Sequence, residues 1–335
     1  MTHRRTALTL ALLMLTTLGT SAVQAAGPTQ STPSTPAAVA FPTRPVTLIV
    51  PTPPGGASDI SARLIARSLS STWGQPVLVE NRTGANGAIA AQAAMAAPAD
   101  GYTLLWGLSS MAGLPFVQKA VPFRSLADLE PVGNAVQLGY ALFASRDLPV
   151  QNFADLVAHG RANPGRLNVA TGPLAEYGMA LHVLGAVGVK AERVPYKGGA
   201  QLMPDLISGQ VQLNFGPIIN GLQHVRSGKI RVLATALPQR SPLLPDVPTF
   251  AELGLPPGGL PNWNAVFAPP GTPRAISERV AAAMAAALRD PAVFGPMVQN
   301  GVVPVGSTPQ QLAEAVASAT AAWKDFVSTH QIPQE

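Results

Sequence analysis

The chain has 335 residues, of which 47% are hydrophobic and 12% are charged, and it contains no cysteine. The missing cysteines exclude a disulfide scaffold, and a formal net charge of +5 from scattered basic residues excludes the dense basic stripe of a nucleic-acid-binding surface. A chain of this length can bury large hydrophobic cores and favours two domains over one.

Residues 1–25 have the layout of a secretory signal peptide. His3, Arg4 and Arg5 precede an apolar run over residues 7–18, and small residues follow over 19–26. The small-residue rule places cleavage after Ala25, and a retained N-terminal anchor is the alternative. Removal of two of the 22 basic residues would leave 20 against 17 acidic residues, a net charge of +3. Residues 26–40, rich in Pro, Thr, Ser and Ala, predict a disordered leader, so the exported protein would fold from residue 41 onward.

The fold is expected to begin with a strand, a glycine turn and a helix. The β-branched run 46–50 predicts a buried strand, and the helical pattern that starts near Asp59 places Ile60, Leu64 and Leu69 on one face. The spare N–H groups and partial positive charge of a helix start suit a carboxylate or phosphate, and Gly55 and Gly56 would allow close approach. Alternatively, the glycines only make a tight turn, and Ser58 or Asp59 caps the helix.

The rest of the chain repeats this alternation. Strands are predicted over 77–80, 102–106, 167–170, 193–196, 211–215 and 230–234, with helices between several of them. Two C-terminal helices, which start at Thr272-Pro273 and at the capping box of Thr308 and Gln311, are expected to pack on the first domain. The alternation predicts parallel sheets in two doubly wound α/β domains, with 41–140 and 237–335 forming domain 1 and 141–236 forming domain 2.

Four loops follow the carboxyl ends of predicted strands, where open parallel sheets bind ligands. They are the Gly55-Gly56 turn, Ser109-Ser110, Thr171-Gly172 and residues 196–199. These loops would converge if the two domains face each other across a cleft.

Catalytic and metal-binding patterns are missing from the sequence. The histidines at positions 3, 159, 182, 224 and 330 have no metal-ligand spacing, and there is no Gly-x-Ser-x-Gly elbow. A triad of Ser58, His182 and Asp205 has no support from its spacing. We therefore expect a protein that is not an enzyme and that carries no cofactor and no metal.

Six segments together resemble one protein family. They are residues 41–56 with Asp59, 74–82, 100–105, 194–211, 244–249 and 267–273. In this order, over residues 41–323, they resemble the Bug-type periplasmic solute-binding receptors of tripartite tricarboxylate transporters. The resemblance implies the type II periplasmic-binding-protein fold, in which two α/β domains close over a small solute in the cleft between them.

The resemblance also implies the binding residues and the partners. The first-domain clamp would be Gly55, Gly56, Ser58 and Asp59, followed by the polar pair Ser109 and Ser110; the facing loop would be Thr171 and Gly172, bordered by Tyr196 and Gly198. Backbone N–H groups and water, without an arginine such as Arg63 or Arg67, would hold a ligand carboxylate. The protein would be a periplasmic monomer that delivers its solute to transporter membrane subunits; the alternative is a ligand sensor that serves a sensor kinase.

Several positions depart from the family pattern. Thr52 stands where an aromatic residue is usual, Met111-Ala112-Gly113 and residues 171–174 replace more polar stretches, and Gly216-Pro217 stands where an aspartate is common. These departures predict a less polar pocket that disfavours a small tricarboxylate. Met111 and Leu174 would either line this pocket or belong to the core.

Overall fold

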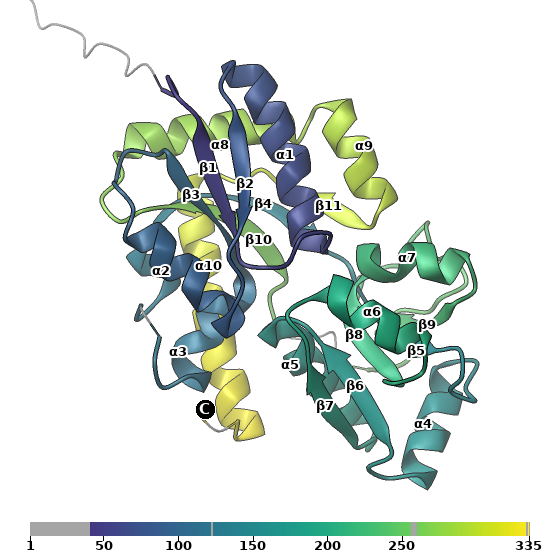
Figure 1. Ribbon diagram of the computed structural model, residues 1–335. Coiled ribbons are helices and arrows are strands. Elements are labelled where there is room, and N and C mark those ends of the chain that lie inside the picture. The colour runs from purple at the N-terminus through teal and green to yellow at the C-terminus, as the bar shows by residue number, and fades with distance from the viewer. Residues whose placement is uncertain (1–40, 122, 256–259, 333, 335) are drawn as a thin grey trace, which may run out of the picture. The chain divides into compact units, whose positions relative to one another are not determined.

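Two mixed β-sheets organise the computed structural model, which describes residues 41–121, 123–255, 260–332 and 334 (Figure 1). The predicted signal peptide and leader lie outside the described residues. We call the first sheet with its covering helices lobe 1 and the second sheet with its covering helices lobe 2. Among the described residues, no helix combines the length and the apolar character needed to cross a membrane.

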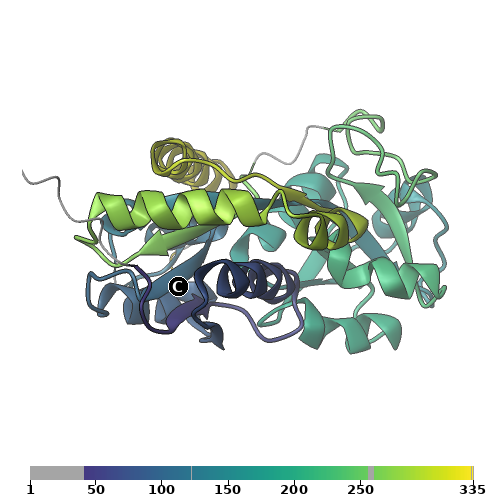
Figure 2. The ribbon, with the colours of Figure 1, turned by 90° about the horizontal axis from the view of Figure 1, so that it is seen from above.

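The sheet of lobe 1 has the strand order β11-β4-β10-β3-β1-β2. Its strands are β1 (Val46–Val50), β2 (Val77–Asn81), β3 (Thr103–Leu108), β4 (Glu130–Leu138), β10 (Trp263–Ala268) and β11 (Val302–Pro304). Its helices are α1 (Ala57–Trp73), α2 (Ala88–Met95), α3 (Leu114–Val117), α8 (Arg274–Ala287), α9 (Pro291–Gln299) and α10 (Pro309–His330). Helix α1 packs against β2 and α8, and α10 packs against β4, so the C-terminal helices do cover this lobe (Figure 2).

The sheet of lobe 2 has the order β7-β6-β8-β5-β9. Its strands are β5 (Tyr140–Ser145), β6 (Leu167–Thr171), β7 (Ala191–Pro195), β8 (Leu213–Pro217) and β9 (Ile230–Thr235). Its helices are α4 (Phe153–Ala162), α5 (Leu174–Ala186), α6 (Gly199–Ile207) and α7 (Ile218–Arg226). Helix α5 packs against β6 and β8, and α7 packs against β5 and β9.

The predicted parallel pairing is found in only part of each sheet. Strands β2, β1 and β3 are parallel, as are β7, β6 and β8, but β10 runs antiparallel to β3 and β4, and β5 runs antiparallel to β8 and β9. The reason is that the chain crosses between the lobes inside an extended segment: β4 ends at Leu138 and β5 begins at Tyr140. A strand that enters a sheet from the other lobe arrives from the opposite end and therefore pairs antiparallel.

The crossing at Gly139 is tightly surrounded. A Cβ at this glycine would lie 3.1 Å from the carbonyl oxygen of Gly301, and also 3.1 Å from side-chain atoms of Ile218 and Leu237. The Gly139 N–H donates to the same Gly301 carbonyl at 3.2 Å. These contacts are tighter than ordinary van der Waals distances, so glycine lets the segments at the crossing pack closely.

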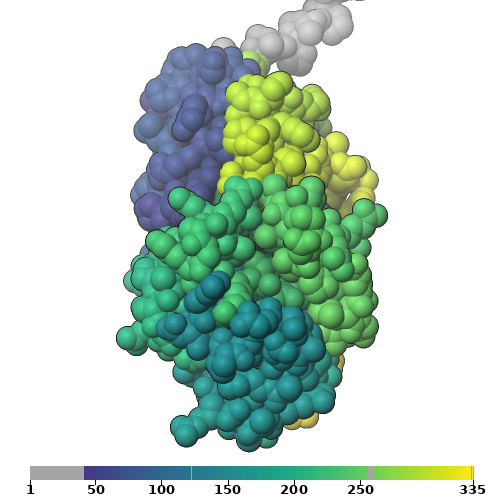
Figure 3. Space-filling view, turned by 90° about the vertical axis from the view of Figure 1, so that its right-hand side faces the viewer, coloured from purple at the N-terminus to yellow at the C-terminus, as the bar shows by residue number. Residues whose placement is uncertain are grey.

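The hydrophobic core joins segments that are distant in the sequence. In lobe 1 the indole of Trp323 on α10 is fully buried and fills the space where a Cβ on Gly113 would lie, at 2.5 Å from the ring. N-terminal and C-terminal parts of the described chain thus lie side by side, as α1 and α9 also do (Figure 3). Met111 and Leu174 belong to this core, with exposed fractions of 0% and 4%, which decides between the two interpretations of these side chains.

Candidate ligand-binding site

The turn between β1 and α1 is held by a carboxylate that reaches back from the helix. Gly55 has φ +81°, a left-handed conformation that favours glycine, and Gly56 is the N-cap residue. The expectation that Ser58 or Asp59 caps the helix is wrong, because both lie inside its first turn and no side chain caps it. Instead Asp59 Oδ2 accepts the Gly55 N–H at 2.9 Å, which fixes the turn from the helix side.

Asp59 is saturated with donors and does not line a cavity. Its carboxylate, with a residue exposure of only 3%, also accepts from Arg63 Nε at 2.9 Å and from Asn81 Nδ2 at 2.8 Å. Burial on its own raises the pKa of Asp59, but the hydrogen bonds from Arg63, Gly55 and Asn81 and the positive charge of Arg63 outweigh it and hold the pKa below its usual value. Asp59 therefore stays ionised and works as a structural tie within lobe 1.

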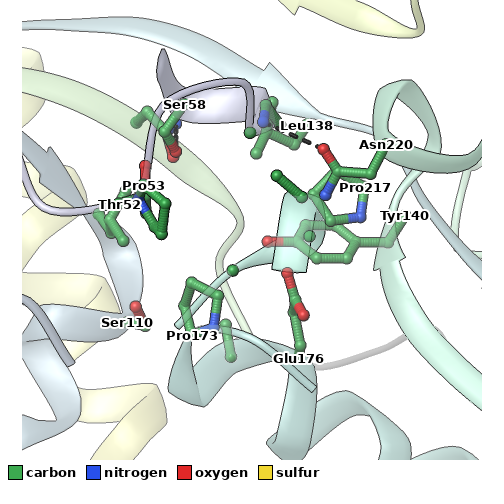
Figure 4. A pocket seen from close by; sticks show the side chains of 18 of the residues that line it. Thr52, Pro53, Ser58, Ser110, Leu138, Tyr140, Pro173, Glu176, Pro217 and Asn220 are labelled. Atoms are coloured by element: carbon green, nitrogen blue, oxygen red, sulfur yellow. Dashed lines mark hydrogen bonds between the residues drawn. The ribbon is translucent and has the colours of Figure 1, made fainter. Parts of the chain in front are cut away.

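A cavity opens between the two lobes beside this turn (Figure 4). It contains about 490 Å³ of empty space, part of which is open to the surface. Of the residues predicted from the sequence, the lining includes Gly56, Ser58, Ser109, Ser110 and Gly198. Leu138 and Tyr140, on either side of the crossing between the lobes, also line the cavity, so its floor lies at the place where the lobes are joined.

The other predicted residues lie elsewhere. Gly172 and Tyr196 line an adjoining cavity that shares Thr52, Leu108 and Pro173 with the first. Gly55 borders a third hollow, which shares Gly199, Ala200 and Asn220 with the first cavity. Thr171 is fully buried, and its hydroxyl accepts a hydrogen bond from Arg193 Nε at 3.2 Å.

Tyr196 uses its hydroxyl inside lobe 2. The hydroxyl donates to Asp205 on α6, and burial together with this hydrogen bond and the charge of Asp205 raises the pKa of Tyr196 to about 12. The phenol is thus held by the protein itself.

The lobes touch each other beside the cavity. Asn220 Oδ1 on α7 accepts the Ala57 N–H from the start of α1 at 3.1 Å, drawn as a dashed line in Figure 4. A Cβ on Gly198 would lie 3.1 Å from Pro53 Cδ. A side chain on Gly198 would crowd Pro53, so glycine favours the close approach of the two loops. One of the spare N–H groups of α1 already bonds to the opposite lobe.

Two hydroxyl groups at the lobe 1 wall have no hydrogen-bond partner among the described residues. They are Thr52 Oγ1 and Ser110 Oγ, and both residues are buried. Buried polar atoms in native proteins are nearly always hydrogen-bonded, so such a pair next to a cavity indicates a place for a polar ligand or water. Neighbouring Ser109 is different, because its hydroxyl donates to the Pro261 carbonyl at 2.6 Å.

Ser58 is positioned from the central strand of lobe 1. The Asn264 side-chain amide lies 2.8 Å from Ser58 Oγ. With the amide turned so that its oxygen accepts from both Ser58 and Trp106 Nε1, its nitrogen donates to the Trp263 carbonyl. The sequence analysis missed Asn264 because β10 was not predicted.

Glu176 is the second residue that the sequence analysis missed. It lies in the first turn of α5, is only 2% exposed, and lines the cavity opposite Ser58 and Thr52 (Figure 4). Its Oε2 accepts the N–H of Gly172, so the donor predicted for the ligand is already occupied. Burial raises the pKa of Glu176 to about 8, although the Gly172 hydrogen bond and the charge of Arg193 act in the opposite direction. A carboxylate four residues after a loop glycine, as in Gly55 and Asp59, was the pattern that could have revealed it.

The described residues show no assembled catalytic or metal site. They contain no group of three or more His, Asp or Glu side chains that could hold a metal ion. The members of the considered triad are engaged separately: Ser58 with Asn264, Asp205 with Tyr196, and His182 with the ring of His330 at 6.3 Å. Within the described lining of the cavity, Glu176 is the only carboxyl group, and no lysine, arginine or histidine is present.

Two α/β lobes with a cavity between them form an arrangement that suits the capture of a small solute. Comparison with known proteins specifies the class. The model of the tripartite tricarboxylate transporter family receptor matches residues 61–332. The chain belongs to this family, which confirms the resemblance, the two-domain α/β fold and the expectation that the protein is not an enzyme. It is a solute-binding receptor of the periplasm.

Individual relatives cover most of the chain. Protein BugT of Bordetella pertussis is 36% identical over 292 residues, which is 86% of this chain and 89% of BugT. A solved structure of an R. palustris protein with adipate has a TM-score of 0.84 and 33% identity, and covers 88% of this chain and 100% of its own. MatC of Rhodopseudomonas palustris with bound malate has a TM-score of 0.79 and 31% identity, and covers 86% of this chain and 100% of its own.

Proposed function

We propose that this receptor captures a small carboxylate-bearing molecule in the cavity between its lobes and delivers it to the membrane subunits of a transporter. The observation that carries the proposal is the start of α1, with Gly56 and Ser58, at the wall of a cavity shared by both lobes. Adipate and malate, the molecules bound to two similar proteins, are both carboxylates. The family description names a transporter receptor, which favours transport over the sensor-kinase alternative.

The carboxylate would be held by neutral donors. The described lining offers no cationic side chain, whereas the first turn of α1 has N–H groups that no earlier helical carbonyl can reach. The hydroxyls of Thr52 and Ser110, which have no partner among the described residues, add two further donors. A hydrogen bond to a charged group contributes about 1.5–3 kcal/mol, so three of them supply much of the roughly 8 kcal/mol of a micromolar Kd.

The remaining expectations from the sequence form part of this proposal. The receptor acts as a monomer, its lobes correspond to the predicted domains with boundaries near 140 and 237, and its signal peptide is cleaved after Ala25. The intact mass of protein taken from a periplasmic extract tests the cleavage. A mature chain that still carries Arg4 and Arg5 would contradict it.

A thermal-shift series tests the ligand class. Monocarboxylates and dicarboxylates of increasing length are compared with their neutral amides or methyl esters, which keep the shape and lose the charge. A true ligand at 100 times its Kd adds about 2.7 kcal/mol to the free energy of unfolding, which gives a clear rise in Tm. The proposal fails if no carboxylate raises the Tm, or if the fully neutral counterparts raise it as much.

A further inference from the structure

The cavity has one end that suits a carboxylate and one end that does not. At the lobe 1 end lie the start of α1 and the hydroxyls of Thr52 and Ser110, all of them donors. At the lobe 2 end lies the carboxyl group of Glu176, which is buried and lines the same space. A ligand that spans the cavity therefore meets donors at one end and a carboxyl group at the other.

The surroundings of Glu176 do not neutralise a further negative charge. No lysine, arginine or histidine is among the described residues that line the cavity. The Arg193 guanidinium of β7, which does not line the cavity, acts on Glu176. The Tyr140 phenol of β5 does line the cavity, and burial together with the charge of Glu176 raises the pKa of this phenol. The charge of Arg193 lowers the pKa of Glu176 by less than burial raises it. A second ligand carboxylate placed here would meet a neutral carboxyl group below a pH of about 8 and would be repelled by the ionised Glu176 above it.

We propose that Glu176 determines specificity at the lobe 2 end of the cavity: the ligand carries a carboxylate at one end and a hydrogen-bond-donating nitrogen, an amide or an ammonium group, at the other. This inference rests on the proposed function, because it assigns the second end of a ligand whose first end is the carboxylate. A carboxyl oxygen of Glu176 accepts a hydrogen bond from the ligand N–H, while Oε2 continues to accept the N–H of Gly172. Dicarboxylates of the same length are disfavoured once Glu176 is ionised, because the two carboxylates then repel each other.

Isosteric ligand pairs give the sharpest test. Succinate, glutarate and adipate are each compared with their monoamides, in which one carboxylate becomes an amide of the same size, and with the corresponding ω-amino acids. Calorimetry on the full mature protein at pH 9, where Glu176 is ionised, should give a preference of about tenfold or more for the monoamide or the ω-amino acid at the length that fits. The monoamides carry a neutral N–H donor and the ω-amino acids carry a cation, so their relative affinities show which of the two groups the site prefers.

The variant Glu176→Gln replaces the carboxyl group of the protein with an amide of the same size. The glutamine amide can donate to a ligand carboxylate, so this variant should lose the preference for the monoamide and gain affinity for the dicarboxylate. Glu192→Gln is the matched control, because Glu192 is an exposed carboxylate on β7 in the same lobe, outside the cavity lining. It should leave the preference unchanged.

A pH profile separates recognition from a merely structural role. In the wild-type protein, dicarboxylate affinity should fall as the pH rises from 6.5 to 9, because Glu176 then ionises; in Glu176→Gln it should stay flat. If Glu176→Gln does not fold, the ligand pairs and the pH profile measured on the wild-type protein still test the inference. Equal or tighter binding of dicarboxylates in the wild type at pH 9 would overturn the inference and leave the receptor proposal standing. If no carboxylate of any kind binds, the receptor proposal itself fails.

Discussion

The β1–α1 and β6–α5 junctions use the same backbone device with opposite electrostatics. In each, a parallel strand ends in a loop glycine, and the third residue of the next helix accepts the N–H of that glycine: Asp59 from Gly55, and Glu176 from Gly172. Asp59 is further bound by Arg63 and Asn81, so its pKa is lowered, whereas Glu176 is buried at the cavity and its pKa is raised to about 8. The same turn geometry can thus serve as a scaffold in one lobe and as a recognition element in the other.

The largest effect is expected from removing the scaffold carboxylate. Asp59→Ala removes the buried carboxylate that accepts from Gly55, Arg63 and Asn81, and a hydrogen bond to a charged group contributes about 1.5–3 kcal/mol to the free energy of unfolding. Asp59→Asn keeps an acceptor for the Gly55 N–H, so its free energy of unfolding should fall by less. Urea denaturation measures both. If Asp59→Ala is as stable as the wild type, the β1–α1 turn does not depend on this tie.

The two carboxylates should give opposite pH dependence of stability. Asp59 has a lowered pKa when folded, so its contribution is present above the unfolded value of 3.8 and is lost as the pH falls through the folded pKa. Glu176 has a raised pKa, so the folded state holds its proton more firmly, and stability decreases as the pH rises from 4.5 to about 8.

Substituting each carboxylate in turn separates the contributions of Asp59 and Glu176 to this pH dependence. Glu176→Gln should therefore match the wild type near pH 4 and be more stable near pH 8, whereas Asp59→Asn should flatten only the acidic limb. Melting temperatures across the pH range, measured without ligand, check both signs. A wild-type Tm that rises steadily between pH 5 and 8 relative to Glu176→Gln would contradict the assignment for Glu176.

Ligand affinity should depend on the N-cap glycine more than on the neighbouring arginine. Gly56 lines the cavity, so Gly56→Val is expected to weaken carboxylate binding by tenfold or more, because its side chain obstructs approach to the helix start. Arg63→Ala should change affinity only slightly, since Arg63 bonds to Asp59 and Asn81 outside the cavity lining. Calorimetry with the best carboxylate of the thermal-shift series compares them. Lost binding in Arg63→Ala with retained binding in Gly56→Val would overturn the anchoring by backbone N–H groups.

The smallest effect is expected where the β1–α1 loop of lobe 1 touches the β7–α6 loop of lobe 2. Gly198→Ala places a Cβ about 3.1 Å from Pro53 Cδ, which is tight, so closure should weaken and affinity should fall severalfold. Gly185→Ala on α5 is the control, because nothing lies within 4 Å of its Cβ. Small-angle scattering with and without ligand should give a smaller radius for the bound wild type and a smaller change for Gly198→Ala. An unchanged wild-type radius at saturation would argue against mobile lobes.

Local patterns in the sequence determined the α/β class, the strand–turn–helix unit at residues 46–69 and the family. These features depend on neighbouring residues: β-branched runs, helical periodicity, and glycines between them. Only the tertiary structure decided how the chain crosses between the lobes, at Gly139 before β5 and again between β9 and β10, which makes β5 and β10 antiparallel to their neighbours. It also decided the roles of the two carboxylates. Asp59 and Glu176 stand in the same local pattern, and what separates them is the arginine and the asparagine around one and the cavity beside the other. Burial and pairing with distant groups set the charge of a side chain, and no local sequence pattern contains that information.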